Sequence, residues 1–281
     1  MEQKLIFLDI DGTLLPPGEM LVPPSTVEAM RKARANGHKL FLCTGRNLRM
    51  TRPLLDYGFD GAVCSAGGYV FCGDKVLVDL PMAPELAAGV RAVLERHGVE
   101  CTLETRDATY SGMEMMKRWS FTHAAADGPL NSEAARWRKA MEDGMNLTPL
   151  AEYKGEPVYK IVFIAEHAHD LDEAKQLYGD RFVFCESKLD GLDGGFVNGE
   201  LINRQFDKGR GIAAICKYLN RSLADTIGFG DSDNDLQMTD VAGISVCMAN
   251  GSENLKRRCD RIAPSVYDDG IAKEFAALGL I

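Results

Sequence analysis

This sequence of 281 residues lacks several patterns that would identify the class of a protein directly, such as a membrane-spanning run or paired cysteines. No apolar run is long enough to span a bilayer, and the apolar stretch at the start is too short for the core of a signal peptide. We therefore expect no membrane association and a cytoplasmic location. The eight cysteines are scattered without a CxxC pair, which argues against a zinc site or a disulfide framework. We interpret them as buried thiols that pack like small apolar side chains.

Positive charge is also scarce. Lysine and arginine number 32 against 41 aspartates and glutamates, the formal net charge is -9, and no run of basic residues offsets it. Such a surface repels phosphate backbones, so we expect no nucleic-acid partner. The P-loop pattern, GxxxxGK followed by Ser or Thr, does not occur, which argues against Walker-type nucleotide chemistry. With 46% hydrophobic and 26% charged residues, the composition favours an ordinary globular protein.

Both ends of the chain have the pattern of a parallel sheet covered by helices, because short apolar runs alternate there with amphipathic segments. In the first third, the spacing Ser25-x-x-Glu28 indicates a capping box and predicts a helix that ends at Gly37. In the last third, residues 208–220 have helical spacing. The strand candidates are, in chain order, KLIFLD, KLFLCT, AVCS, TIGFGD and ISVCM.

The middle of the chain has a different pattern. Residues 69–80 alternate around Gly-Asp like a hairpin, and helices are predicted for 84–97, 132–143 and 169–178, with strand-like segments between them. A glycine-rich run, 189–199, then leads back to the first pattern. The predicted fold is therefore α/β: a Rossmann-like parallel-sheet core that is discontinuous in sequence, with an inserted α+β domain. We place the core at 1–82 and 200–281 and the insertion at 83–199.

Two carboxylates follow the first apolar run. Alternate residues of a strand point the same way, so Asp9 and Asp11 can address one site if the extended conformation continues past Leu8. A polar Asp-Gly turn that merely ends a strand is the other interpretation of this short pattern.

A second acidic cluster, residues 231–235, follows the predicted strand TIGFG. In open α/β sheets, ligands bind beyond the carboxyl ends of the strands, so acidic groups after two separate strands can meet there. A few carboxylates together with substrate oxygens suit Mg²⁺. Such a cation would offset the repulsion between the acidic groups, although an acidic cluster also often caps a helix.

Two further segments fit a phosphate group. Thr44-Gly45-Arg46 follows the strand KLFLC, and a hydroxyl with freed backbone N–H groups at a glycine turn suits an anion. Lys208 stands in the first turn of a predicted helix, where its charge opposes the helix macrodipole. An anion in front of that helix would explain its position.

These four segments, in this order, resemble the motifs of the haloacid dehalogenase superfamily. The matching residues are DxDGT as Asp9-Ile10-Asp11-Gly12-Thr13, the hydroxyl of the second motif as Thr44, the lysine as Lys208, and GDxxND as Gly230 to Asp235. Only residues 14–43 separate the first two motifs, whereas 47–207 separate the second from the lysine. An insertion at this point resembles the Cof-type, sugar-phosphatase-like branch, whose inserted domain is an α/β cap.

The resemblance implies an enzyme, a Mg²⁺-dependent phosphatase that hydrolyses a small phosphorylated metabolite, with a sugar phosphate as the expected ester. Asp9 would be the nucleophile that forms an aspartyl-phosphate, and Asp11 would exchange protons with the leaving group and water. The implied site residues are, for catalysis, Asp9, Asp11 and Lys208; for phosphate, Ile10, Thr44, Gly45, Lys208 and Asn234; for substrate, Arg46; and for the metal, Asp9, the Asp11 backbone carbonyl, Asp231 and Asp235.

Alternatives remain open at this point. A hexose phosphomutase could share the nucleophile, and a phosphosugar-binding or receiver-like signalling protein could share the motifs without turnover. The chain departs from the family at Ala66, where relatives commonly have asparagine, and this weakens any inference about substrate. Within the insertion, Arg106, Trp119, Arg136 and Trp137 are large enough to contact a substrate, but packing or surface roles are equally open to them. The oligomeric state, monomer or homodimer, is not predicted.

Overall fold

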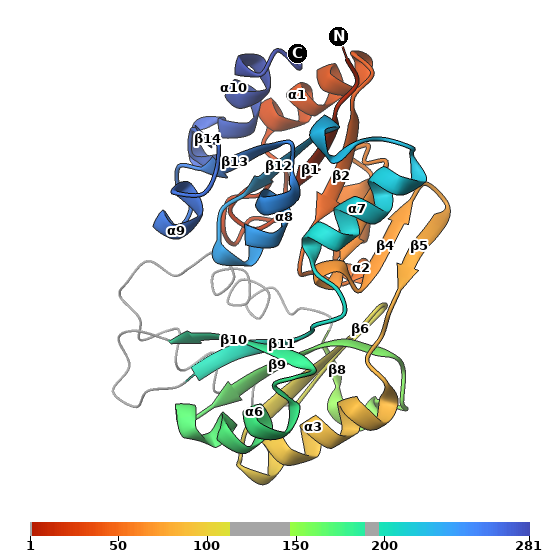
Figure 1. Cartoon of the computed structure of the whole chain (residues 1–281), viewed down its shortest axis with the longest axis vertical. Coiled ribbons are helices and arrows are strands. Elements are labelled where there is room, and N and C mark those ends of the chain that lie inside the picture. Colours follow the sequence, from red (N-terminus) through yellow and green to blue (C-terminus); the bar gives the residue numbers. More distant parts are fainter. Residues whose placement is uncertain (1, 113–146, 189–196) are drawn as a thin grey trace. The chain divides into compact units, whose positions relative to one another are not determined.

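The computed structural model describes residues 2–112, 147–188 and 197–281, which form two compact units (Figure 1). The core unit consists of 2–79 and 207–281, so the two ends of the chain fold together. The cap unit consists of 80–112, 147–188 and 197–206.

The core unit is built on an eight-stranded sheet in the order β14-β13-β12-β1-β2-β3-β4-β5. All neighbours from β14 to β3 are parallel, and β4 and β5 add an antiparallel hairpin at one edge. The strands are β1 (Leu5–Leu8), β2 (Lys39–Cys43), β3 (Gly61–Cys64), β4 (Tyr69–Cys72), β5 (Lys75–Asp79), β12 (Thr226–Gly230), β13 (Ile244–Met248) and β14 (Arg261–Ala263). The five strands and the hairpin predicted for this part of the chain are therefore present.

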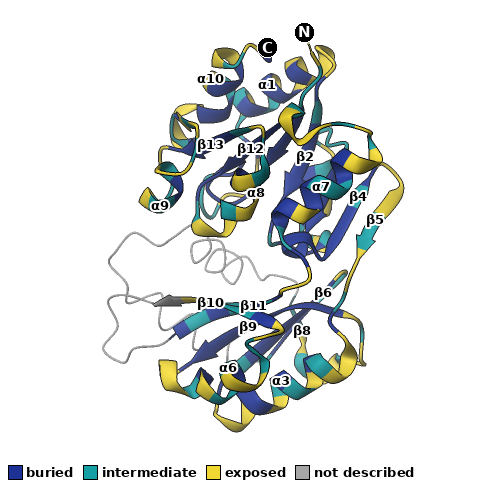
Figure 2. Cartoon of the chain, in the orientation of Figure 1, coloured by how far each residue is buried: buried dark blue, intermediate teal, exposed yellow. Residues whose placement is uncertain are grey.

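Helices cover both faces of this sheet. On one face, Ile212 and Ile215 of α7 pack against Phe7 and Phe41 of the central strands. On the other, α1 packs with α10, and the ring of Phe275 in α10 meets the edge of Phe229 in β12. The helices are α1 (Pro24–Ala35), α2 (Leu48–Leu55), α7 (Lys208–Tyr218), α8 (Leu236–Val241), α9 (Glu253–Lys256) and α10 (Gly270–Ala277). Figure 2 shows the resulting buried strands between helices with exposed outer sides.

The capping box predicted at Ser25 is wrong. The helix begins at Pro24, and its N-cap, Pro23, makes no side-chain hydrogen bond. Proline suits this first position because it has no N–H to leave unsatisfied. The Ser25 hydroxyl instead donates to Asp269, 2.5 Å away. The predicted stop at Gly37 is correct, since Gly37 has φ of +91° and donates its N–H to Arg34.

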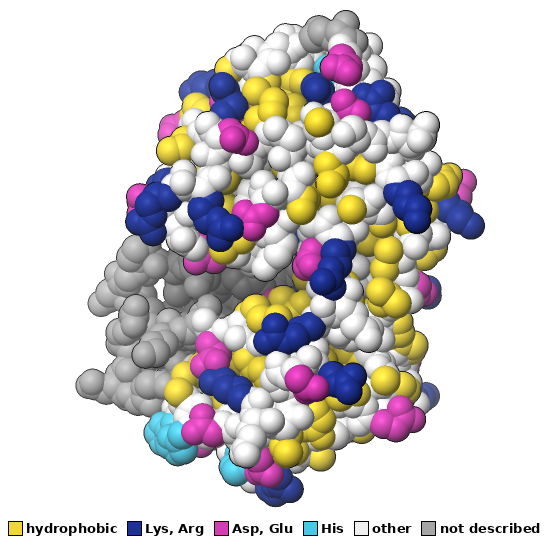
Figure 3. Space-filling view, in the orientation of Figure 1, with side chains coloured by type: hydrophobic (Ala, Val, Ile, Leu, Met, Phe, Trp, Pro, Cys, Tyr) yellow, Lys and Arg dark blue, Asp and Glu magenta, His cyan; other side chains and the backbone are white. Residues whose placement is uncertain are grey.

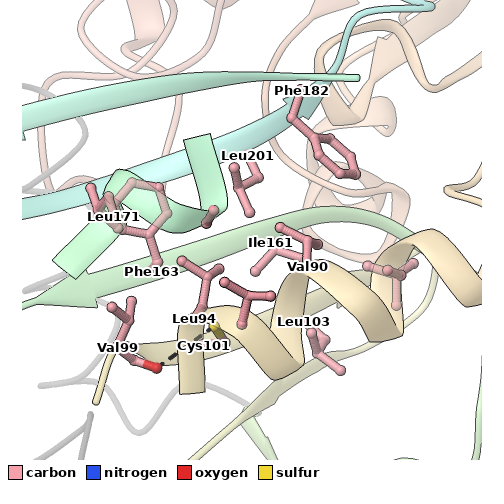
Figure 4. Packing of buried hydrophobic residues seen from close by; sticks show 14 of the residues in the cluster. Val90, Leu94, Val99, Cys101, Leu103, Ile161, Phe163, Leu171, Phe182 and Leu201 are labelled. Carbon is pink, nitrogen blue, oxygen red and sulfur yellow. Dashed lines mark hydrogen bonds between the residues drawn. The ribbon is translucent and has the colours of Figure 1, made fainter. Parts of the chain in front are cut away.

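The cap unit contains a six-stranded sheet in the order β10-β11-β9-β6-β7-β8, antiparallel except between β7 and β8. Residues such as Phe163, Leu201 and Leu103 on one sheet face pack against Val90 and Leu94 of α3 (Figure 4). The elements are α3 (Pro84–Arg96), β6 (Glu100–Thr105), β7 (Thr109–Ser111), β8 (Leu147–Pro149), β9 (Val158–Ala165), α6 (Asp172–Tyr178), β10 (Phe182–Lys188) and β11 (Val197–Asn203). The predicted fold class, an α/β core with an inserted α+β domain, is confirmed.

Strand β11 was not predicted, since the glycine-rich run that contains its start was interpreted as a connection. It pairs with both β9 and β10, and its residues alternate between buried and half-buried along the whole strand. Gly199 is required there because a Cβ atom would lie 2.3 Å from the Cys185 carbonyl oxygen and 2.5 Å from the Phe163 ring. The units divide at 79/80 and 206/207, where 82/83 and 199/200 were expected. The helix predicted for 132–143 lies outside the described residues.

Within the part of the chain that the structure describes, no helix has both the length and the apolar character needed to cross a bilayer. Acidic and basic side chains are interspersed on the face shown in Figure 3.

Candidate active site

Asp9 is held at the carboxyl end of the central strand β1. Leu5 and Phe7 face α7, and because side chains alternate along a strand, Asp9 points to the same side. The Asp9 N–H donates to the Phe229 carbonyl oxygen at 3.0 Å, which extends the pairing with β12 by one residue. The side chain is buried, with 5% of the residue exposed.

Lys208 reaches Asp9 from the first turn of α7. The helix begins there because the Asp207 side chain accepts the N–H of Arg210 and thereby caps it. The Lys208 ammonium is buried and donates to Asp9 Oδ1 at 2.7 Å and to Asp235 Oδ1 at 2.5 Å. One cation thus joins carboxylates from β1 and from the loop after β12, which lie 226 positions apart in sequence.

The pKa values of Asp9 and Lys208 are both raised, but for different reasons. Burial raises the pKa of Asp9 to about 8, with help from the nearby Asp235 carboxylate and against the opposing effect of Lys208. Burial works against the ammonium of Lys208, but the carboxylates of Asp235 and Asp9 hold its pKa well above the usual value. The site therefore contains more negative groups than Lys208 alone neutralises.

The loop after β12 supplies the remaining carboxylates. Asp235 Oδ2 accepts the backbone N–H groups of Asp231 and Ser232, at 3.0 and 3.2 Å, so its position is fixed by the loop itself. One oxygen from each of Asp9, Asp231 and Asp235 lies within 4.8 Å of the other two, and all three residues are buried. Three hard oxygen donors with excess negative charge fit a divalent cation such as Mg²⁺. Among the described residues, this is the one group of this kind.

Asp11 lies outside this carboxylate group. The chain turns after Asp9, where the N–H groups of Leu14 and Leu15 donate to the carbonyls of Asp9 and Ile10. The extended conformation does not continue to Asp11, so the condition for Asp9 and Asp11 to address one site by strand alternation is not met, and the turn sets the direction of the Asp11 side chain. The Asp11 carboxylate accepts two hydrogen bonds from Arg46. A metal contact through the Asp11 backbone carbonyl stays a prediction.

The second motif follows β2. The N–H of Thr44 donates to the Val63 carbonyl oxygen at 2.8 Å, and its hydroxyl accepts the N–H of Arg46 at 3.1 Å. Arg46, predicted as a substrate contact, is buried and pairs with Asp11. The phosphate roles of Thr44 and Gly45 stay predictions.

The other candidate residues differ in burial and in their distance from Lys208, and some lie outside the described residues. Asn234 is exposed and its side-chain oxygen lies 3.4 Å from the Lys208 ammonium. Ile10 is fully buried, with its carbonyl in the turn that follows Asp9. Arg106 is exposed and pairs with its neighbour Asp107. The candidates Trp119, Arg136 and Trp137 lie outside the described residues.

Two residues of the site were not predicted from sequence. The Asn250 amide donates to the Gly12 carbonyl oxygen at 2.8 Å and so ties the loop after β13 to the first motif. Ser65, directly after β3, donates its N–H to the Arg46 carbonyl oxygen at 2.8 Å. Asn250 lies just past the predicted strand ISVCM, and Ser65 is the last residue of the predicted strand AVCS; a polar residue at the carboxyl end of a strand is the signal that could have identified both.

The family model for haloacid dehalogenase-like hydrolases matches residues 6–275, which is nearly the whole chain. The chain belongs to this family. The resemblance seen in the four motifs is thereby confirmed, and with it the expectation of an enzyme of the hydrolase class.

Relatives of this hydrolase align over nearly all of its length. It is 26% identical over 282 residues to the 5-amino-6-(5-phospho-D-ribitylamino)uracil phosphatase YwtE of Bacillus subtilis (96% of each chain). It is 25% identical over 280 residues to the pyridoxal phosphate phosphatase YbhA of Escherichia coli (97% of each chain). Its fold matches that of the subclass IIB sugar phosphatase BT4131 with a TM-score of 0.74 and 24% identity, covering 99% of this chain and 100% of that one.

Proposed function

We propose that this hydrolase is a Mg²⁺-dependent phosphatase that cleaves a small phosphorylated metabolite, with a sugar phosphate as the first candidate, through an aspartyl-phosphate on Asp9. The main support for this proposal is that Asp9, Lys208 and the Asp231–Asp235 loop lie together in one buried cluster. A carboxylate can attack an anionic phosphoryl group only where positive charge is concentrated, and this cluster is built to hold both an ammonium and a cation.

The residues that would hold the ion are Asp9 and Asp231, with Asp235 held between the loop backbone and Lys208. When bound, Mg²⁺ supplies positive charge that offsets the repulsion between the carboxylate and the phosphoryl oxygens. Lys208 adds a second positive group at 2.7 Å from the nucleophile, and because it is buried, its charge is little screened by water.

The chemistry proceeds in two displacements. In the first, an Asp9 oxygen forms a bond to phosphorus, the ester P–O bond breaks, and the departing oxygen takes a proton from Asp11. In the second, water attacks phosphorus, Asp11 takes a proton from that water, and the bond between Asp9 and phosphorus breaks. Phosphate and the regenerated Asp9 carboxylate are the products, and Asp11 ends in its starting protonation state.

The substrate class is supported by the three relatives named above. Their names give a phosphorylated ribitylamino compound, pyridoxal phosphate and sugar phosphates as substrates. The acidic balance of the chain, with a net charge of -9, disfavours polyanionic polymers as substrates. We therefore rank sugar phosphates first and phosphorylated cofactors second.

The test is a phosphate-release assay of the purified full chain with MgCl₂ against sugar phosphates, nucleotides and pyridoxal phosphate. Activity should disappear with EDTA and in Asp231→Asn. Asp233→Asn is the matched control, because it removes the same charge from the same loop at an exposed position whose partner is Ser252. Turnover only with a hexose bisphosphate activator would indicate a mutase, and a stable aspartyl-phosphate without release would indicate a signalling protein. Either result would overturn the proposal.

A further inference from the structure

Arg46 and Asp11 form a buried two-point ion pair. Arg46 Nη2 donates to Asp11 Oδ1 at 2.6 Å and Nε donates to Oδ2 at 3.0 Å. Only 5% of Arg46 and 8% of Asp11 is exposed. A guanidinium that bonds both oxygens of a carboxylate fixes the plane of that carboxylate as well as its position, which a lysine cannot do.

The backbone of Arg46 is itself anchored on two sides. Its N–H donates to the Thr44 hydroxyl, and its carbonyl accepts the N–H of Ser65 from the turn after β3. The backbone around Asp11 is also held, because Gly12 donates its N–H to the Leu15 carbonyl oxygen at 2.8 Å. Each partner thus has a fixed backbone, and the pair with Arg46 fixes the plane of the Asp11 carboxylate.

We infer that Arg46 is a positioning residue that acts through Asp11, and that its main role is not to bind the substrate phosphate. This inference rests on the proposed function, in which Asp11 gives a proton to the leaving oxygen. An acid is effective only when it is held within hydrogen-bonding reach of that oxygen. Arg46 bonds each Asp11 oxygen once, and each carboxyl oxygen has a second position at which a proton can be carried, so orientation by Arg46 and proton exchange by Asp11 are compatible.

The leaving group provides the test, because only poor leaving groups need a proton. The alkoxide of a sugar is a strong base, whereas p-nitrophenolate departs without protonation. In Arg46→Ala, the single-turnover rate of leaving-group release from the best sugar phosphate should fall about 100-fold, and that from p-nitrophenyl phosphate less than about fivefold, with nearly unchanged half-saturating concentrations. This measurement isolates the first displacement, because the later hydrolysis of the aspartyl-phosphate also uses Asp11 and is the same for both esters. The same dependence on leaving group is expected for Asp11→Asn.

Two further variants separate charge from geometry. Arg46→Lys keeps the positive charge but loses the two-point pairing, so it should resemble Arg46→Ala on the sugar phosphate. The double variant with Asp11→Asn should be no slower than Asp11→Asn alone. Arg258→Ala is the matched control, because Arg258 also bonds both oxygens of an aspartate, Asp240, but at an exposed position. It should leave both rates of leaving-group release unchanged.

An equal loss in the rate of leaving-group release from both esters in Arg46→Ala, or a rise in the half-saturating concentration alone, would show that Arg46 binds the phosphate and would overturn the inference. Full activity in Arg46→Lys would overturn it as well. Absence of turnover in the unmodified chain is a different outcome, since it contradicts the proposed function. In that case thermal unfolding still tests the pair: the losses in Tm of Arg46→Ala and Asp11→Asn should not add in the double variant, and additive losses would reject the pairing.

Discussion

The core unit and the cap unit each bury one lysine between two carboxylates, but they build this arrangement differently. In the core unit, Lys208 at the start of α7 meets Asp9 and Asp235, which follow the ends of two parallel strands. In the cap unit, Lys160 in the middle of β9 lies 2.6 Å from Glu200 of β11 and 3.3 Å from Glu104 of β6.

The difference lies in what surrounds each lysine. The cap cluster is produced by strand register, since Glu104 is paired directly with Lys160 across the sheet, and its charges are fixed within regular strands. The core cluster contains three buried carboxylates from the two loops that follow β1 and β12. These loops lie at the carboxyl ends of parallel strands, which is where ligands bind in open α/β sheets. A buried ion cluster is therefore not a catalytic site by itself. Its place at the strand ends gives the core cluster its chemistry.

The largest expected effect is on catalysis in the core cluster. Asp9→Asn removes the proposed nucleophile with almost no change in volume, so kcat should fall by about 10⁴-fold or more. In the cap cluster, Glu200→Gln makes the same type of change and should alter kcat by less than about tenfold. Steady-state assays of both variants against the best ester provide the measurement. Comparable losses in the two variants would remove the distinction between the clusters.

The second effect is on stability in the cap cluster. Lys160→Met removes the positive charge beside Glu104, which is fully buried, so the free energy of unfolding should decrease by about 3–5 kcal/mol. The double variant Lys160→Met with Glu104→Met should recover most of this loss, because no buried charge then remains in that pair. Urea denaturation followed by circular dichroism measures both. A loss below about 1 kcal/mol in the single variant would show that the pair is well solvated.

The third effect concerns pH in the core cluster. With its pKa near 8, Asp9 carries a proton at pH 6 in the metal-free protein, and this proton must leave when a cation binds. The affinity for Mg²⁺ should therefore rise with pH, by about tenfold per unit below pH 8, and become constant above it. Calorimetric titration with MgCl₂ between pH 6 and 9 tests this dependence. An affinity that does not change over this range would contradict the raised pKa.

The smallest effect concerns the turn after β3, which supports the core cluster. Ala66 has φ of +55°, a left-handed conformation that favours glycine. Ala66→Gly should thus raise the free energy of unfolding by up to about 1 kcal/mol. Ala62→Gly, in the regular strand β3, is the matched control and should lower it by about the same amount. Thermal unfolding compares them, and equal losses in both variants would show that the turn is not strained.

Most of the fold could be predicted because the apolar runs are short and separated by clear breaks. The strands that carry Asp9 and Asp231 and the helix that carries Lys208 were all identified from sequence. Strand β11 was missed, because Gly199 weakens the strand pattern and the reason for that glycine is the Phe163 ring, which is distant in sequence. The helix start at Pro24 could not be predicted, because the same residues fit two helix starts. One has Ser25 as the N-cap residue, and the other has proline in the first turn, as the structure shows.

The site was predicted as a set of residues, but its pairings were not. Arg46 is predicted from sequence as a substrate contact, and no local pattern shows that its guanidinium also pairs with Asp11. The turn after Asp9 likewise could not be inferred. Side chains that alternate between the two faces identify a strand, but this alternation does not show at which residue the strand ends. Asn250 was not recognised because its partner, the Gly12 carbonyl, belongs to the other end of the chain.

The sequence by itself determined which chemical groups follow which strands, because hydrophobic periodicity and turn residues are local properties of the chain. The tertiary structure alone decided which of these groups share a hydrogen bond and which of them are withdrawn from water. Asp9 illustrates the division: its place after β1 can be read from neighbouring residues, but its raised pKa depends on burial and on Asp235, which only the folded parallel sheet brings beside it.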